Sequence, residues 1–126
     1  MKAKAELRLT RRALRDIRLI FDFSRKRRGK QTAETSLDEL EAGFGILKEH
    51  PDLLRPEPDF HAALRFYRVN RYLLVGDVQP GSIVVLTVIH ASRDLPARLA
   101  ELQPTLATEV EILHHKLHAG PKRKGP

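Results

Sequence analysis

The chain contains no cysteine and no tryptophan, and its 126 residues include only two tyrosines. Without cysteine it can form neither a disulfide nor a thiolate metal site, which suits a reducing compartment, so we expect a cytoplasmic protein. No apolar run approaches the roughly 20 residues that a membrane-spanning helix needs, so no membrane partner is expected. The N-terminal residues also lack the apolar core of about 7–15 residues that a secretory signal peptide carries.

Positive charge is abundant and unevenly distributed. The sequence holds 23 Lys and Arg against 16 Asp and Glu, which gives a net charge of +7. Residues 1–30 contribute +9, residues 31–118 contribute −5, and residues 119–126 contribute +3. Such asymmetry indicates a polyanionic partner, either nucleic acid or an acidic protein. A solvated helix face that keeps the chain soluble explains the same charge, and composition alone favours that simpler explanation.

The first half of the chain predicts a short strand and a helical hairpin. Apolar and charged residues alternate over residues 5–9, which is typical of a half-exposed strand. Thr10 is placed to cap a first helix that ends near Gly29, and a second helix is expected over residues 32–50. Gly43 and Gly45 weaken that second helix, and close packing would explain why they are there. The two apolar faces consist of Ala13, Leu14, Ile17, Ile20 and Phe21 in the first helix, and Ala33, Leu37, Leu40, Phe44 and Leu47 in the second.

The second half predicts a sheet followed by helices. Residues 51–61 carry three prolines and form an extended connector. Strands are expected over 64–69, 72–78 and 83–89, joined by turns at Asn70–Arg71 and Pro80–Gly81, with the last strand central and covered on both faces. Pro104 suits the first turn of a separate last helix, after a short helix with Leu95, Leu99 and Leu102. The last helix would carry an apolar stripe of Leu106, Val110, Leu113 and Leu117.

These elements predict an α+β fold of order β-α-α-β-β-β, in which a helical hairpin packs on a mostly antiparallel sheet, plus an extra C-terminal helix. Four short motifs occur in the chain in this order: ALRDIRLIFDF from residue 13, HPDLLRPEPDF from 50, LRFYRVNRYLL from 64 and VIHASRDL from 88. With these motifs the chain resembles the RelE/ParE superfamily of toxins from type II toxin–antitoxin systems, closer to the ParE branch, over about residues 3–95.

We therefore divide it into a toxin domain, residues 1–103, and a helical extension with a basic tail, residues 104–126. The sequence departs from the family at Val75, Gly76 and Asp77, where aromatic residues are common, so packing or a partner contact is expected to differ there.

The resemblance implies two alternative activities. RelE-like toxins cut messenger RNA on the ribosome, whereas ParE-like toxins poison DNA gyrase by binding it, and both kinds are neutralised by an antitoxin. Metal-free RNA cleavage needs an acid, a base and cations on the phosphate, and His90 is the residue best suited to proton transfer. Arg65 and Arg68, however, lie on opposite faces of a strand. Residues 63–95 contain no lysine, and no tyrosine follows Tyr72, so the set typical of RelE-like nucleases is incomplete.

We therefore expect a gyrase-binding toxin that forms a hetero-oligomer with its antitoxin. The alternatives are a ribosome-dependent endoribonuclease, in which His90, Arg65 and Arg68 would be catalytic, and a non-toxic module of the same fold that binds an antitoxin. The antitoxin is expected to lie over Arg11, Arg15 and Arg18 of the first helix. The residues expected at the target-facing edge of the sheet are Arg65, Arg68, Arg71, His90 and Arg93.

No cofactor or metal site is expected. His114 and His118 stand four residues apart on the last helix, with Glu111 three residues before His114, and this spacing can hold a divalent cation. The zinc-protease pattern HExxH is absent from the sequence. Cationic side chains near the C-terminal end of a helix are explained by the helix dipole.

Overall fold

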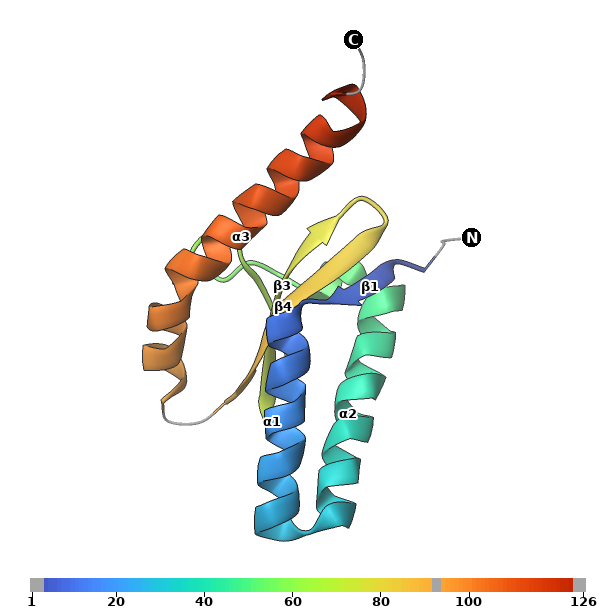
Figure 1. Ribbon diagram of the computed structural model, residues 1–126, viewed down its shortest axis with the longest axis vertical. Helices are drawn as coiled ribbons and strands as arrows, with labels where there is room; N and C mark the ends of the chain where they lie inside the picture. The colour runs from blue at the N-terminus through green and yellow to red at the C-terminus, as the bar shows by residue number, and fades with distance from the viewer. Residues whose placement is uncertain (1–3, 92–93, 124–126) are drawn as a thin grey trace.

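The structure of the protein, a computed structural model, describes residues 4–91 and 94–123, with side chains described as far as His115. The elements form three layers, with a helical hairpin on one face of a sheet and a long helix on the other (Figure 1). In chain order they are β1 (Glu6–Leu9), α1 (Arg11–Arg28), α2 (Lys30–Glu49), the short 3-10 helix η1 (Pro51–Leu53), β2 (Arg65–Val69), β3 (Tyr72–Gln79), β4 (Ser82–His90) and α3 (Leu95–Arg123).

The sheet has the strand order β1-β4-β3-β2. β1 runs parallel to β4, and the other two pairings are antiparallel, so the predicted α+β fold with a mostly antiparallel sheet is confirmed. β4 is buried from Ile83 to Ile89, as its apolar sequence predicted for a central strand covered on both faces. The two predicted turns are also present, with positive φ angles of 51° at Asn70 and 74° at Gly81. A glycine suits the second position because it adopts such angles without a steric penalty.

The hairpin is anchored to the sheet at the start of α1. The Thr10 hydroxyl oxygen accepts a hydrogen bond from the Ala13 N–H at 3.1 Å, which is the predicted cap, and donates one to the Leu86 carbonyl at 2.8 Å. Gly29, with a φ of 95°, ends α1 and immediately precedes α2. The predicted apolar face of α1 is wrong at Leu14, which is 53% exposed because it points away from α2 and the sheet.

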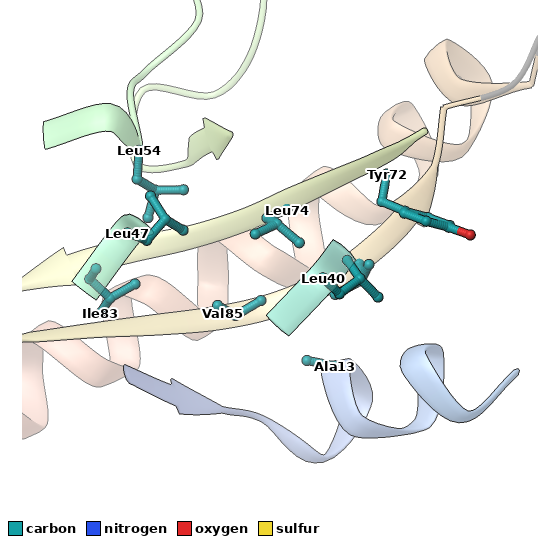
Figure 2. Packing of buried hydrophobic residues seen from close by; sticks show 9 residues of the cluster. Ala13, Leu40, Leu47, Leu54, Tyr72, Leu74, Ile83 and Val85 are labelled. Carbon is teal, nitrogen blue, oxygen red and sulfur yellow. The ribbon is translucent and has the colours of Figure 1, made fainter. Parts of the chain in front are cut away.

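Two hydrophobic cores lie on opposite faces of the sheet. On the hairpin side, Ala13 of α1 and two leucines of α2 point toward the strands (Figure 2). Gly43 lets α2 approach β2 closely, because a Cβ atom there would lie 2.6 Å from a methyl carbon of Val69. The close packing expected at the two α2 glycines is therefore found at Gly43 and not at Gly45, where the space is open. The buried members of this core are Ala13, Leu40, Leu47, Leu54, Tyr72, Leu74, Ile83, Val85 and Val88.

The second core lies under α3. One continuous helix stands where two were predicted, so the helix start expected at Pro104 is wrong. A proline inside a helix removes one backbone hydrogen bond and bends the axis, and Figure 1 shows α3 changing direction before its long C-terminal part. The buried side chains of α3 in this core are Leu99, Leu106 and Val110, and they compensate for the lost bond. The predicted boundary between residues 103 and 104 falls within this helix. None of the described helices is long and apolar enough to cross a membrane.

Candidate functional site

His90 lies at the end of β4, where it is exposed and faces Tyr72 of the neighbouring strand. The edge of one ring meets the face of the other, with a centroid distance of 5.6 Å and an interplanar angle of 83°. Tyr72 itself is buried, and its hydroxyl donates a hydrogen bond of 3.3 Å to the Ser36 hydroxyl of α2. The imidazole is therefore held against a fixed aromatic ring at the junction of the sheet and the hairpin.

A cavity of about 480 Å³ opens beside His90, between the C-terminal half of α1, the start of α2, the start of β3 and the end of β4. Its wall is partly apolar, and two of these side chains are unusually exposed for their size, Leu19 at 59% and Phe23 at 60%. Among the described residues, its basic side chains are three arginines and His90, and none of the side chains that line it is a carboxylate. The lining residues are Leu19, Ile20, Phe23, Ser24, Arg27, Arg28, Thr32, Ser36, Arg71, Tyr72 and His90.

A second hollow of about 330 Å³ lies on the other side of Leu19 and His90, toward the start of α3. Asp16 lines it, and its carboxylate accepts hydrogen bonds from the Thr87 hydroxyl and, at 3.0 Å, from the Val88 N–H. Asp16 therefore links α1 to the part of β4 that follows its pairing with β1. His90 lies between the two hollows, so a partner chain that covers it contacts both.

The residues predicted for the target-facing edge do not all meet. Arg71 and His90 line the same cavity. Arg65 is half-buried, with its guanidinium 3.5 Å from the Leu54 carbonyl, and Arg68 donates a 2.6 Å hydrogen bond to the Asn70 carbonyl. Arg65 and Arg68 point to opposite faces of β2, as strand geometry predicted, and neither lines the cavity beside His90. Arg93 lies outside the described residues.

The three arginines predicted to bind an antitoxin are all exposed on the outer face of α1. Arg11 and Arg15 border a hollow of about 400 Å³ between α1 and α3, whereas Arg18 does not. Their neighbour Arg12 points toward α3 instead, where both of its terminal nitrogens lie 2.7 Å from the Glu109 carboxylate oxygens. This double hydrogen bond raises the pKa of Arg12, although its partial burial acts in the opposite direction.

Sequence reasoning missed most of the cavity. Arg27 and Arg28 were not among the predicted site residues, and Leu19 and Phe23 lie outside the predicted apolar face of α1. The spacing of these two residues was the available signal, because large apolar side chains four positions apart on a helix share one surface. The Arg27 guanidinium lies 5.0 Å from the centre of the Phe23 ring, a cation–π contact that belongs to the same surface.

The sequence spacing of the α3 histidines could hold a metal ion, but the structure gives His114 another partner. His114 lies 2.8 Å from Asp77, a buried carboxylate of β3, while His118 lies beyond the described side chains. Within the described part of the chain, no group of three or more His, Cys, Asp or Glu side chains is placed to hold a metal ion.

Comparison with known proteins matches residues 7–95, more than half of the chain, to the ParE toxin of the type II toxin–antitoxin system parDE. The chain belongs to the ParE toxin family. The predicted RelE/ParE resemblance and its ParE branch are thereby confirmed. The match ends at Leu95, the first residue of α3, so this helix lies beyond the family's matched region.

Two solved structures share the fold of this ParE-family chain. One is from the chromosomal ParDE system of P. aeruginosa, with a TM-score of 0.62 and 16% identity, covering 71% of this chain and 98% of that one. The other is from the toxin–antitoxin complex RelBE2 of Mycobacterium tuberculosis, with a TM-score of 0.51 and 23% identity, covering 73% and 98%. No curated protein matches the chain.

Proposed function

We propose that this ParE-family toxin acts in the cytoplasm by binding DNA gyrase, and that it does not cut RNA. The cavity beside His90 would be the contact surface, with its exposed apolar side chains as anchors and its arginines as partners for carboxylates. Buried aromatic residues and arginines are the residue types that dominate binding energy at protein interfaces. Support comes from membership of the ParE family together with the composition of this cavity.

One observation carries the choice of binding over cleavage: among the described residues, the cavity holds a single group suited to proton transfer. RNA cleavage without a metal requires both a base and an acid. His90 can serve as one of them, but the hydroxyl of Tyr72 is engaged by Ser36 in a buried position. The remaining lining side chains are apolar, hydroxyl-bearing or guanidinium groups, none of which exchanges protons readily near neutral pH.

One specific observation favours the ribonuclease alternative, namely that three arginines line the same cavity as His90 and could hold a phosphate. Measuring gyrase supercoiling and ribosome-programmed mRNA cleavage in parallel separates the two functions. We expect supercoiling to be inhibited and the message to stay intact. Cleaved message that disappears with His90→Ala would overturn the proposal in favour of the nuclease.

A pair of arginine variants tests whether the cavity is the gyrase contact. Arg71→Gln removes a cation from the cavity wall, whereas Arg55→Gln removes an exposed cation that does not line the cavity. A charge-assisted hydrogen bond at an interface contributes about 1.5–3 kcal/mol, so Arg71→Gln should weaken inhibition by roughly 10- to 100-fold. Arg55→Gln should leave inhibition unchanged. Equal inhibition by both variants would exclude this cavity as the contact.

We further propose that an acidic antitoxin segment neutralises the toxin and contacts Arg11, Arg15 and Arg18. These arginines follow one exposed face of α1, and none of them forms an ion pair with another described residue. Replacing all three with glutamine should weaken binding of the antitoxin, measured by titration calorimetry. The same number of charges removed at Lys4, Lys48 and Arg55 provides the control, and an equal loss there would show that only net charge matters.

A further inference from the structure

The turn between α1 and α2 carries the densest positive charge in the described structure. It lies at the end of the hairpin that extends past the sheet, at the bottom of Figure 1. Five of the six residues from 25 to 30 are cationic, and all of them are exposed. We call this group the basic tip, and it consists of Arg25, Lys26, Arg27, Arg28 and Lys30.

No described carboxylate forms an ion pair with the basic tip. The nearest carboxylates along the chain are Asp22 and Glu34, both outside the turn. The four ion pairs among the described residues all lie elsewhere. Five like charges on one turn repel one another, so the cluster lowers stability unless another feature of the fold or a partner compensates.

The fold compensates only in part. The last turn of α1 holds four of the cations, where the negative end of the helix dipole stabilises each by about 0.3–1 kcal/mol. Lys30, however, begins α2, where the dipole is positive and a carboxylate would be favoured. The first turn of α2 contains no acidic residue, and no side chain caps it. Helix stability therefore explains the arginines before Gly29 but neither Lys30 nor the missing acid.

The chemistry of the basic tip fits phosphate better than protein. A protein interface needs a desolvated apolar centre, and residues 25–32 contain no apolar side chain. The nearest exposed one is Phe23, which precedes the tip and lines the cavity beside His90. Single-stranded nucleic acid is bound by stacking its bases on free aromatic rings, which the basic tip does not offer. A duplex backbone requires only closely spaced, exposed cations.

We propose that the basic tip binds the phosphate backbone of duplex DNA, without reading its sequence. The contact with phosphates follows from the charge and exposure of the tip alone. The choice of DNA over duplex RNA rests on the proposed function, because gyrase works on DNA. Bound in this way, the protein has two adjoining surfaces, the cavity beside His90 for protein and the basic tip for DNA, and they share Arg27 and Arg28.

The test measures binding of the full chain to a fluorescent 30-base-pair DNA duplex by anisotropy, at a series of salt concentrations and without gyrase. The test variant is Arg25→Gln, Lys26→Gln and Lys30→Gln, which leaves the arginines of the cavity in place. The control is Lys4→Gln, Lys48→Gln and Arg55→Gln, which removes three exposed cations outside the basic tip. Both variants change the net charge from +7 to +4, since each removes three cations.

The salt dependence distinguishes contact from general attraction. Each neutralised phosphate contributes about −0.9 to the slope of log K against log salt, so five contacts predict roughly −4.5 and the two left in the test variant roughly −1.8. The control should keep the wild-type slope. Equal losses in both variants, or no change in the test variant, would overturn the proposal. Lys30→Gln alone should reduce the slope by about 0.9 without weakening α2, which keeps the test valid if the triple variant folds poorly.

Two further arms test the identity of the partner. A duplex RNA of the same sequence that binds more tightly would overturn the choice of DNA. Polyglutamate that displaces the DNA at equal charge concentration would overturn the choice of nucleic acid. Because gyrase is absent from these measurements, their failure differs from failure of the supercoiling assay, and either surface can be rejected by itself.

Discussion

The two faces of the sheet are covered in different ways. On one face, the side chains of Thr10 and Asp16 fix the hairpin to the backbone of β4. The Thr10 hydroxyl donates a hydrogen bond to a carbonyl of β4, and the Asp16 carboxylate accepts one from an N–H of that strand. On the other face, α3 is held by its apolar stripe, by the Arg12–Glu109 ion pair and by the 2.8 Å contact between Asp77 and His114. The family match includes the first face in full and stops where α3 begins. The hairpin is thus integral to the toxin fold, whereas α3 is a covering added to it.

Asp77 shows how the sheet is adapted to this covering. It is one of the residues at which we expect the sequence to differ from the family, and it is buried in β3 with contacts to His114 and Gln79. An isolated buried carboxylate is costly, and its partner here comes from α3. Asp77 therefore joins the sheet to the chain's own C-terminal helix.

Removing α3 beyond Gln103 should have the largest effect on this comparison. The shortened chain loses the buried side chains of Leu106 and Val110, worth about 1.5–3 kcal/mol each, and uncovers the sheet beneath them. A domain of this size is stable by only about 5–15 kcal/mol, so residues 1–103 are expected to unfold at low temperature or to bind the dye ANS. Circular dichroism melting measures the loss. A native melting curve would instead support a self-sufficient domain of residues 1–103.

Single leucine variants compare the two faces more finely. Leu40 of α2 and Leu106 of α3 are both buried, so Leu40→Ala and Leu106→Ala should each lower the unfolding free energy by about 2–5 kcal/mol in urea titrations. Ile46→Ala and Ile112→Ala are the controls on the same helices, since these side chains are 45% and 57% exposed. In both leucine variants, the exchange of backbone amide hydrogens should become faster throughout the domain. If Leu106→Ala accelerates exchange in α3 alone, the added helix detaches separately from the rest.

What could be predicted from the sequence was mostly local. Alternation in β1, the cap at Thr10 and the turns at Asn70 and Gly81 depend on neighbouring residues, and they were right. Pro104 was read by the same local rule and was wrong, because burial of α3 against the sheet outweighs one missing hydrogen bond. Arg71 and His90 could be placed together from strand pairing. Arg27 and Arg28 could not be placed with them from the sequence, since only the folded hairpin brings these arginines to the same cavity.

The smallest expected effect concerns the Arg12–Glu109 ion pair, which joins α1 to α3. In Arg12–Glu109 two parallel hydrogen bonds of 2.7 Å join side chains that are only 27% and 32% exposed. Partial burial reduces the screening by water, so a double-mutant cycle with Arg12→Ala and Glu109→Ala should give a coupling of about 1 kcal/mol.

The matched control is Arg8–Glu6, a pair with side chains 68% and 64% exposed, whose coupling should be indistinguishable from zero. High salt should lower the first coupling only slightly, because ions screen exposed pairs much more than partly buried ones. If the Arg12–Glu109 coupling is no larger than that of Arg8–Glu6, this pair does not help to fasten the added helix. The apolar stripe and the Asp77–His114 contact would then hold α3 on the sheet. Ion pairing would no longer distinguish the way α3 is held from the way the hairpin is held.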